Sequence, residues 1–289
     1  MYGKTIKNIR SNKGLKQKDI CQDIVTLSYY SRIEREISTP TIDVFLKILD
    51  NLNVSLEEFL FIHNNHKKKE DDIIWFEITE LYHSGDINSL IEYRNILSQE
   101  KYKNENPLVL KRIIDLFIMR LNHKQTEIDL SPITNNLKKI EHWTSREVKI
   151  FISIMDMIPI ELLIIIVNRL IKQKKLYAAS DGYNSPYSKI LINSILLCID
   201  HFKINEAQKY LRSFNNILEV RDVYGKTMYL YLEGLINYVN GNKIEGTKNI
   251  NNSFQIFKLV NMEEFSHKYK IYFEKIKKKT KYNLSSDNS

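Results

Sequence analysis

The sequence predicts an almost entirely helical protein. Glycine and proline, the residues that mark turns and strand ends, are scarce, with 8 and 5 among 289 residues. Long runs rich in leucine, isoleucine, lysine and glutamate lie between them, and these residues favour helices. Apolar residues in the runs recur every three or four positions, as in amphipathic helices. We therefore expect an all-α fold, and the chain length suits two domains.

The first 66 residues predict a domain of five short helices. Four breaks separate the blocks of apolar periodicity: SNKG at Ser11, VT at Val25, ISTP at Ile37 and NLNVS at Asn51. Hydroxyl residues that start the later blocks are expected to cap helices; they are Thr26, Thr41 and Ser55. Glu58, three residues after Ser55, completes the pattern of a capping box.

The rest of the chain, residues 73–289, predicts about ten longer amphipathic helices. The charged block KKKEDD at residues 67–72 is expected to be a linker or an exposed helix start. Later breaks are expected near SGD at Ser84, NENP at Asn104, DLSP at Asp129, a kink at Pro159, DGYNSP at Asp181 and NGN at Asn240. The segments EAQKYL and EGTKNI repeat at an offset of 39 residues, a period typical of helical-hairpin repeats. An ordinary helical bundle is the alternative.

Charge is unevenly distributed and suits a polyanionic partner. The chain carries a net charge of +8. Residues 1–35 carry +5, and residues 36–66 carry −4. Because charge favours association without identifying the partner, the position of the excess matters more than its size. It lies in the opening stretch.

Composition and motifs argue against secretion, a membrane span and enzyme chemistry. Cys21 and Cys198 are too few and too far apart for a disulfide framework or a metal cluster, which favours a reducing cytoplasm. The N-terminus lacks the apolar core of a signal peptide. The most apolar run, residues 150–171, is interrupted by charges and by Pro159, so we expect no membrane span.

Signatures of catalysis and of cofactor binding are also missing from the sequence. It contains no P-loop, no G-x-G-x-x-G, no H-E-x-x-H and no G-x-S-x-G. His63 and His66 lie three residues apart without further ligand-like neighbours for a metal site. We expect no catalytic residues, no metal and no cofactor.

The stretch TLSYYSRIERE, from Thr26, combines a helix cap with side chains that an amphipathic core helix does not need. With Thr26 as the cap, Tyr30 and Ile33 should point inward at helical spacing. Four residues should then face outward: Leu27, Ser28, Tyr29 and Arg32. In a helix-turn-helix, the exposed side of the second helix enters the DNA major groove, which accounts for this mixture.

The segments GKTIKNIRSNKGLKQKDI, TLSYYSRIERE and TPTIDVFLKILDNLNVSLEEF resemble the Xre/Cro-type helix-turn-helix pattern over about 60 residues. More narrowly, SYYSRIE with LNVSLEEFLFIHN is similar to the Rgg/MutR regulators of Gram-positive bacteria. NEAQKYLRSFNNIL and YLYLEGLINYVNGNKIEGTKNINNSFQIF resemble their TPR-like helical-repeat domain, which is related to that of the PlcR and PrgX pheromone receptors. The resemblance implies a cytoplasmic, dimeric transcriptional regulator that binds an inverted repeat in double-stranded DNA.

By position, the resemblance implies that Gln17 contacts phosphate and that Leu27, Ser28 and Arg32 face base edges. Arg32 could donate two hydrogen bonds to guanine, and Leu27 could contact a thymine methyl group. The full expected DNA-binding set is Lys16, Gln17, Lys18, Leu27, Ser28, Tyr29, Arg32 and Arg35. Arg10 and Glu34 are expected to form an internal ion pair instead.

Two residues depart from the pattern. Lys16 replaces the usual threonine that caps the second helix, which could weaken that helix end. Glu36 replaces the usual glycine and places an acid near the expected phosphate track. Both bear on DNA affinity more than on the fold.

The large second domain implies, by the same resemblance, homodimerisation and a groove for a short, unmodified hydrophobic signalling peptide, as in quorum sensing. Asparagine offers a donor and an acceptor to a peptide backbone, and Arg169 could pair with a carboxylate. The expected peptide-binding residues are Asn168, Arg169, Asn193, Tyr231 and Asn237. Two alternatives stay open: a domain that only oligomerises or binds another ligand, and a repeat scaffold for a protein partner. The sequence leaves undecided the operator, the direction of regulation and whether Cys21 or Cys198 bridges a dimer.

Overall fold

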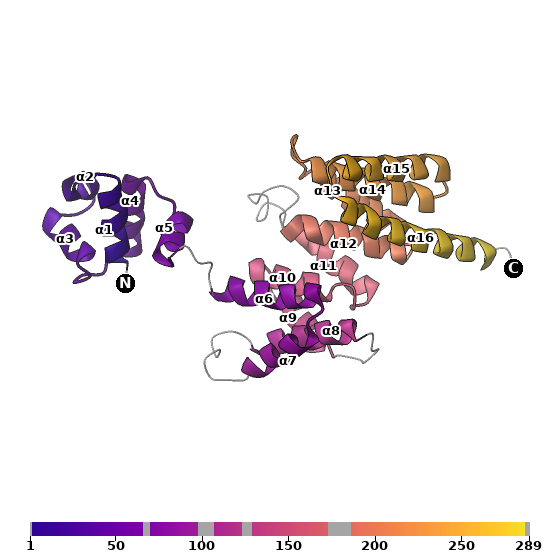
Figure 1. Ribbon diagram of the computed structural model, residues 1–289, viewed down its shortest axis with the longest axis horizontal. Coiled ribbons are helices and arrows are strands. Elements are labelled where there is room, and N and C mark those ends of the chain that lie inside the picture. The colour runs from indigo at the N-terminus through magenta and orange to yellow at the C-terminus, as the bar shows by residue number, and fades with distance from the viewer. Residues whose placement is uncertain (1, 66–69, 98–106, 123–128, 173–185, 287–289) are drawn as a thin grey trace. The chain divides into compact units, whose positions relative to one another are not determined.

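The computed structural model describes residues 2–65, 70–97, 107–122, 129–172 and 186–286, and within them every regular element is a helix (Figure 1). The all-α prediction is therefore confirmed. The chain forms two compact units. The first comprises Met1–Lys101 with Arg120–His123, and the second Tyr102–Met119 with Lys124–Ser289.

The first unit holds seven helices within its described residues: α1 Gly3–Asn12, α2 Gln17–Cys21, α3 Leu27–Glu34, α4 Ile42–Leu52, α5 Leu56–His63, α6 Glu70–Ser84 and α7 Ile87–Ile96. Helices α1 to α5 are the five predicted short helices, and each predicted break lies between two of them. Of the charged block at 67–72, residues 67–69 lie outside the described residues. Residues 70–72 belong to α6, so there the block is a helix start.

The predicted caps of α3, α4 and α5 are confirmed. The hydroxyl oxygens of Thr26, Thr41 and Ser55 each accept the backbone N–H of the third residue of their helix, at 3.3, 3.4 and 3.1 Å. The Glu58 carboxylate accepts the Ser55 N–H in return, at 2.8 Å. Each cap satisfies an N–H that has no partner within the helix.

Apolar side chains of α1 to α5 meet in one core. Tyr30 and Ile33, expected to face inward, are 0% and 1% exposed. They belong to a cluster whose other members are Ile6, Ile9, Ile20, Cys21, Phe45, Ile48, Leu49, Leu52 and Phe59. The back of α3 is therefore fixed, and only its other side remains free to meet a partner.

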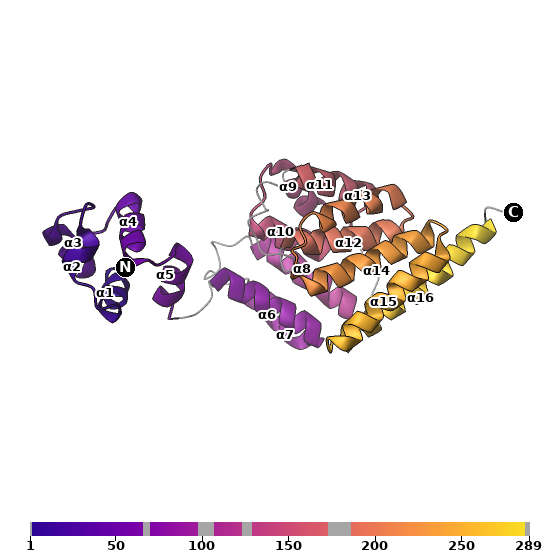
Figure 2. The same cartoon turned by 90° about the horizontal axis from the view of Figure 1, so that it is seen from above.

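The second unit holds nine helices within its described residues (Figure 2): α8 Pro107–Leu121, α9 Ser131–Lys139, α10 Ser145–Ile154, α11 Ile160–Lys172, α12 Pro186–Asp200, α13 Ile204–Asn215, α14 Val223–Val239, α15 Lys243–Leu259 and α16 Glu263–Ser286. The breaks predicted at Ser84, Asp129 and Asn240 separate helices as expected. Those predicted at Asn104 and Asp181 lie outside the described residues.

Pro159 ends a gap between two helices and does not kink a continuous one, so that prediction was wrong. Helix α10 ends at Ile154 and α11 begins at Ile160. The Pro159 carbonyl accepts the N–H of Leu163 at 3.0 Å, as the residue before a helix does. Proline disfavours helical geometry in the residue before it, which is consistent with a complete break.

The 39-residue repeat is confirmed by two helical hairpins, α12–α13 and α14–α15. Shifting α12 and α13 by 39 residues matches the end of α12 to that of α14 and the start of α13 to that of α15. Phe202 and Gly241 occupy the same turn position, and both have positive φ, 54° and 94°. In both turns the next residue donates its N–H to a carbonyl in the last turn of the helix, Lys203 to Cys198 at 2.8 Å and Asn242 to Asn237 at 2.9 Å.

The hairpins stack so that their first helices, α12 and α14, contact each other. Helix α13, which connects them in sequence, contacts both. Helix α10 contacts α12 in the same way, and α16 packs on α14 and α15. This arrangement forms a layer of first helices, α10, α12 and α14, and is typical of helical-repeat proteins.

None of the described helices has the length and apolar content needed to cross a bilayer. Among the described residues, no cluster of three or more histidine, cysteine, aspartate or glutamate side chains is placed to hold a metal ion. Cys21 and Cys198 are free and buried. Burial raises the pKa of the Cys198 thiol to about 12, so a bridge through it would require exposure of the core.

Candidate functional site

The exposed side of α3 carries most of the residues expected to contact DNA. Leu27 is 49% exposed although it is apolar, and Ser28 and Arg32 are exposed one helical turn apart. Arg35 is exposed at the end of the helix, where its Nε donates to the Ser31 carbonyl at 3.3 Å. These side chains project from a helix whose opposite side is locked in the core.

Tyr29 is only half-buried, and it is partly engaged within the domain. Its ring packs against the core, and its hydroxyl donates to the Thr39 carbonyl at 3.3 Å. Tyr29 thus ties α3 to the loop before α4, while part of its ring remains open to a partner.

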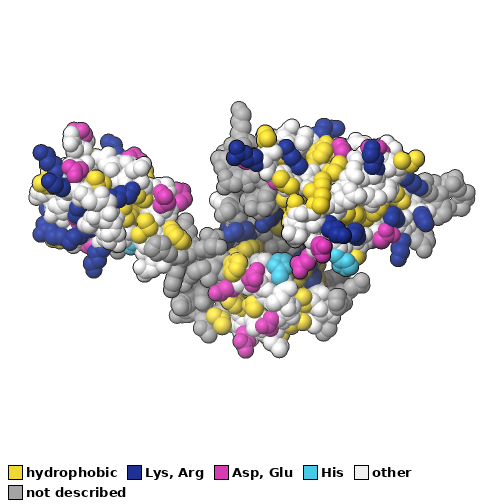
Figure 3. All heavy atoms as spheres, turned by 45° about the horizontal axis from the view of Figure 1, so that its top comes forward, with side chains coloured by type: hydrophobic (Ala, Val, Ile, Leu, Met, Phe, Trp, Pro, Cys, Tyr) yellow, Lys and Arg dark blue, Asp and Glu magenta, His cyan; other side chains and the backbone are white. Residues whose placement is uncertain are grey.

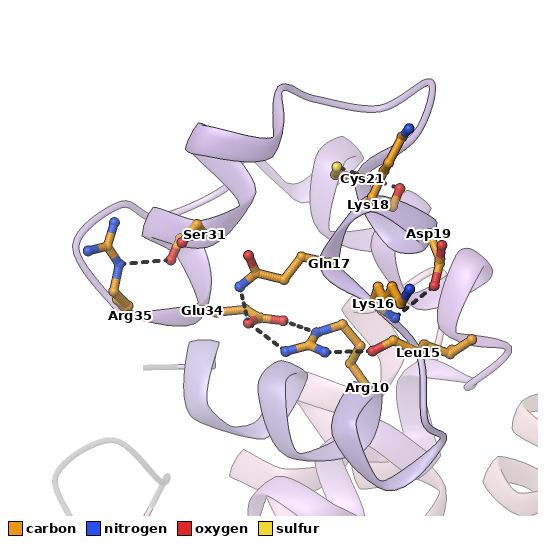
Figure 4. A network of polar contacts seen from close by, with 10 residues as sticks. All are labelled: Arg10, Leu15, Lys16, Gln17, Lys18, Asp19, Cys21, Ser31, Glu34 and Arg35. Atoms are coloured by element: carbon orange, nitrogen blue, oxygen red, sulfur yellow. Dashed lines mark hydrogen bonds and ion pairs between the residues drawn. The ribbon is translucent and has the colours of Figure 1, made fainter.

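A buried carboxylate holds α1, α2 and α3 together (Figure 4). Glu34 is 2% exposed and forms the predicted ion pair with Arg10, whose Nη2 donates to Oε2 at 3.0 Å. Arg10 also donates to the Leu15 carbonyl at 2.6 Å. Gln17, expected to touch phosphate, donates its Nε2 to Glu34 at 2.6 Å. The first turn of α2 is therefore positioned on α3 through Glu34.

Two opposing effects set the pKa of Glu34. Burial raises it, while the hydrogen bonds from Arg10 and Gln17 lower it, and the net result is a pKa below the ordinary value. Glu34 is therefore charged at neutral pH, and the pair Arg10–Glu34 contributes no net charge to the surface.

The start of α2 has half of a capping box. The Asp19 carboxylate accepts the Lys16 N–H at 2.7 Å. A lysine ammonium has no acceptor, so the reciprocal bond that threonine would make is missing. What Lys16 adds instead is an exposed positive charge at the N-terminus of α2, beside that of Lys18.

Glu36 has a role that sequence reasoning missed. Its φ of 62° is left-handed, which explains why glycine is usual at this position. Its carboxylate accepts the Lys4 N–H at 3.3 Å, at the N-terminus of α1, which has no side-chain cap of its own. The Glu36 carboxylate thus caps α1. The sequence could not show this contact because Glu36 and Lys4 lie far apart along the chain.

Cations gather on the side of the first unit that carries α2 and α3 (Figure 3). The exposed cations of the predicted set are Lys16, Lys18, Arg32 and Arg35. Side chains of this kind, on a capped and rigidly packed helix, can neutralise phosphates and reach base edges. We call α3 together with these cations the α3 face.

The residues expected to bind a peptide do not form one cluster. On α11, Asn168 accepts the ammonium of Lys209 from α13 at 2.7 Å. Arg169 donates to the carbonyls of Leu137 and Lys138, both at 2.8 Å, and its guanidinium lies 5.6 Å from the centre of the Trp143 ring. Both terminal nitrogens of Arg169 are thus occupied at the end of α9, so a forked pair with a ligand carboxylate would have to break these bonds.

Tyr231 does not line a groove in this structure. Its side chain is 0% exposed, and its hydroxyl donates to the Tyr269 carbonyl of α16 at 2.8 Å. The ring centres of Tyr231 and Tyr269 are 4.9 Å apart. Tyr231 therefore anchors α16 on α14.

Asn193 and Asn237 are half-buried but occupy different sides of equivalent helices. With the 39-residue repeat, Asn193 corresponds to Leu232 and Asn237 to Cys198. Asn193 and Cys198 are five positions apart on α12, which places them about 140° apart around the helix axis at about 100° per residue. One extended ligand along this layer cannot use both asparagines in equivalent ways.

Two family models match the chain. The model described as helix-turn-helix matches residues 6–59, the stretch that holds α3 and its core. The model described as the C-terminal domain of the HTH-type transcriptional regulator Rgg matches residues 90–271.

Solved structures with the same fold cover nearly the whole chain. A protein described as a transcriptional regulator from Listeria monocytogenes EGD-e is 24% identical, with a TM-score of 0.84 over 96% of this chain and 97% of that one. The SHP pheromone receptor Rgg2 of Streptococcus dysgalactiae is 18% identical, with a TM-score of 0.78 over 95% and 99%. PrgX in its complex with cCF10 is 19% identical, with a TM-score of 0.66 over 96% and 92%. Because the Rgg model spans well over half of the sequence, the chain belongs to the Rgg family of helix-turn-helix transcriptional regulators, which are not enzymes.

Proposed function

We propose that this regulator binds an inverted repeat in promoter DNA as a homodimer and that a short hydrophobic signalling peptide controls it through the second unit. The observation that carries the DNA part is the α3 face: Leu27, Ser28 and Arg32 exposed on a helix that Thr26 caps and that Tyr30 and Ile33 anchor. The chain also belongs to a family of transcriptional regulators, and this membership supports DNA binding. We take residues 1–66 as the DNA-binding domain.

In this proposal the α3 face divides its work between phosphate and base contacts. Lys16, Lys18 and Arg35 neutralise phosphates, and Gln17 approaches the backbone with the N–H that Glu34 leaves free. Arg32 and Leu27 contact base edges, as a forked donor to guanine and an apolar partner of thymine. The two α3 helices of the dimer would enter successive major grooves about 34 Å apart.

The peptide part is supported by relatives of the same fold. One of them is an SHP pheromone receptor, and another is PrgX in a complex with cCF10. Among the residues expected to contact a peptide, Asn193 is half-exposed, and its side-chain amide makes no hydrogen bond to any described residue. Its amide is therefore free to bond a peptide backbone.

A DNA titration tests the first part. Purified protein and labelled DNA from upstream of its own gene are mixed at 50 and 200 mM salt. A dimer with four cations on each α3 face should lose about 10³-fold or more in affinity over this range, because phosphate contacts release counterions. If the protein does not bind this DNA, or if its affinity does not change with salt, DNA recognition through the α3 face is excluded and a scaffold for a protein partner is the remaining interpretation.

The same titration with synthetic peptides encoded by small neighbouring reading frames tests the second part. We expect one peptide to shift DNA affinity and Asn193→Ala to raise the peptide concentration needed about ten-fold, as expected for loss of one or two hydrogen bonds. DNA binding without peptide should be unchanged. Asn216→Ala, at the end of α13, is the matched control.

A further inference from the structure

Apolar side chains lie exposed at one end of the last helical hairpin, where α14 begins and α15 ends (Figure 1). The centre of the Tyr224 ring, at the start of α14, lies 6.1 Å from that of Phe257 on α15 and 5.6 Å from that of Phe265 on α16. Five apolar residues at this end are exposed: Val220 by 88%, Val223 by 56%, Leu259 by 82%, Val260 by 44% and Phe265 by 40%. We call these five residues the hairpin-end patch.

The exposure of the hairpin-end patch is not a property of the hairpin as a whole. Further along α14, the side chains of Tyr231, Leu232 and Leu235 are 0% exposed. Helix α16 packs on both α14 and α15 and leaves the patch uncovered. Single exposed apolar residues are ordinary, but a group of them at one place marks a surface that meets a partner.

Charges around the hairpin-end patch balance one another. Six exposed charged residues lie in the α13–α14 connection, in the first turns of α14 and α16 and in the last turn of α15: Arg221, Lys226 and Lys258, and Glu219, Glu263 and Glu264. In a two-fold contact the same patch of each copy meets itself, so a rim of one sign would repel its partner. A rim with equal numbers of both signs can form pairs instead.

This balance is local, because the whole chain carries a net charge of +8. Such an excess opposes contact between two copies over most of the surface. The hairpin-end patch combines an apolar centre with a rim that does not repel itself. A second copy of this chain is therefore the partner that its chemistry fits.

We propose that two copies of this chain associate through their hairpin-end patches around a two-fold axis. This inference rests on the proposed homodimer and adds the location of its contact. Stable interfaces bury about 800 Å² on each partner, which is more than five apolar side chains supply, so the charged rim takes part. The apolar centre provides most of the affinity, and the pairs of the rim fix the orientation of the two copies.

Other occupants fit this surface less well. A polyanion such as DNA requires an excess of cations, and the rim has no such excess. Capture of a different protein would leave the purified chain monomeric. The oligomeric state of the purified chain therefore separates that occupant from a second copy.

Sedimentation equilibrium of the full chain without DNA, over a range of micromolar concentrations, tests the contact. The native chain should show a monomer–dimer equilibrium. Leu259→Asp should raise the dimer dissociation constant about 100-fold or more, because each copy then places a carboxylate in the apolar centre. Leu259 is mostly exposed in a single chain, so the circular dichroism of the variant should match that of the native chain.

The matched control is Ile244→Asp, the same kind of change on the same helix. Ile244 is 86% exposed but lies at the start of α15, at the opposite end of the hairpin. This variant should dimerise as tightly as the native chain.

A charge reversal tests the rim without touching the apolar centre. Lys258→Glu gives both copies an excess of negative charge and should weaken the dimer about ten-fold at low salt. Adding Glu263→Lys restores the balance and should recover most of the affinity, because charges across an interface act through their complementarity. Failure of the double variant to recover would overturn the two-fold arrangement.

A native chain that stays monomeric at every concentration, a Leu259→Asp variant that dimerises as tightly as the native chain, or an equal loss in Ile244→Asp would overturn the hairpin-end patch as the contact. Failure of the wider proposal looks different. If Leu259→Asp and the native chain form equally stable dimers that both bind upstream DNA, the homodimeric regulator stands and only this location is excluded. If the dimer depends on Leu259 but does not bind upstream DNA, the contact stands and the DNA-binding function fails.

Discussion

Single residues decide whether α3 is held in place for DNA, and Glu34 is the central one. It joins α1, α2 and α3 through Arg10 and Gln17. The ion pair with Arg10 was predictable from the sequence through the family resemblance. The bond from Gln17 was not, because the same pattern assigns glutamine to phosphate and nothing in sequence spacing shows a second use of its amide.

The charge of Glu34 makes the first unit sensitive to acid. Its folded pKa lies below the ordinary 4.5, so its stabilisation is complete above pH 4.5 and is lost as pH falls from there through the folded pKa. We expect protection of α1 and α3 amides from hydrogen exchange to fall between pH 5 and pH 3. Glu34→Gln should reduce protection at pH 6 by about 2–3 kcal/mol and flatten the acid dependence.

The control for this experiment is Glu57→Gln, an exposed carboxylate of α5. It should keep both the protection at pH 6 and its loss in acid. An acid dependence that is equally steep in Glu34→Gln would assign the effect to another group.

Substitution of Gly3 by alanine should destabilise the first unit, although helix propensity alone would predict stabilisation. A Cβ at this position would overlap the carbonyl oxygen of Ile33 at the end of α3. Alanine should gain up to about 1 kcal/mol in a helix, but such overpacking costs about 1–3 kcal/mol. We therefore expect Gly3→Ala to lower exchange protection in α1 and α3 and to weaken DNA binding.

The control is Lys7→Ala, at an exposed position of the same helix, where alanine changes helix propensity without a packing clash. Exchange protection and DNA binding should be unchanged or slightly improved in this variant. Unchanged protection in Gly3→Ala would mean that α1 and α3 do not approach so closely.

At the scale of elements, helix starts were easier to predict than helix ends. Thr26, Thr41 and Ser55 mark starts because a hydroxyl oxygen captures a free N–H. Ends depend on a left-handed residue, and glycine marks it at Gly85 and Gly241. At Phe202 and Glu36 the same conformation falls on residues that rarely adopt it, so the α12–α13 turn gave no signal in the sequence.

The paired turns of the two hairpins make the cost of this conformation measurable. Gly241 has a φ of 94°, and a Cβ there would meet nothing within 4 Å, so its only obstacle is the backbone. Gly241→Ala should destabilise α14 and α15 by about 1–2 kcal/mol, seen as faster exchange of their amides. Gly241→Asn should cost less, because asparagine tolerates the left-handed region.

Lys243→Ala, two residues on, reports any general sensitivity of this turn and should have a small effect. If Gly241→Ala is as stable as the native chain, the turn must adopt another conformation, and the equivalence with Phe202 would be lost.

At the scale of the whole molecule, the sequence predicted the architecture better than the ligand site. Apolar periodicity predicted the all-α fold, and the 39-residue echo together with the family resemblance predicted the repeat domain. Asn193 and Asn237 were both expected to bind the peptide, but the structural repeat sets them five residues out of register, so their positions on equivalent helices differ. Burial of Tyr231 under α16 could not be predicted either, since it depends on a packing partner 38 residues away in sequence.

The proposed function of the whole molecule depends on the exposed side of α3 recognising DNA sequence. The most direct measurement is the affinity of native protein and of Arg32→Ala for upstream DNA and for single-base-pair variants of it, with Lys248→Ala as a control in the second unit. We predict that Arg32→Ala loses discrimination at one base pair, by about 1–3 kcal/mol, and that Lys248→Ala retains it. Equal affinity of native protein for all sequences, or unchanged discrimination in Arg32→Ala, would contradict the claim.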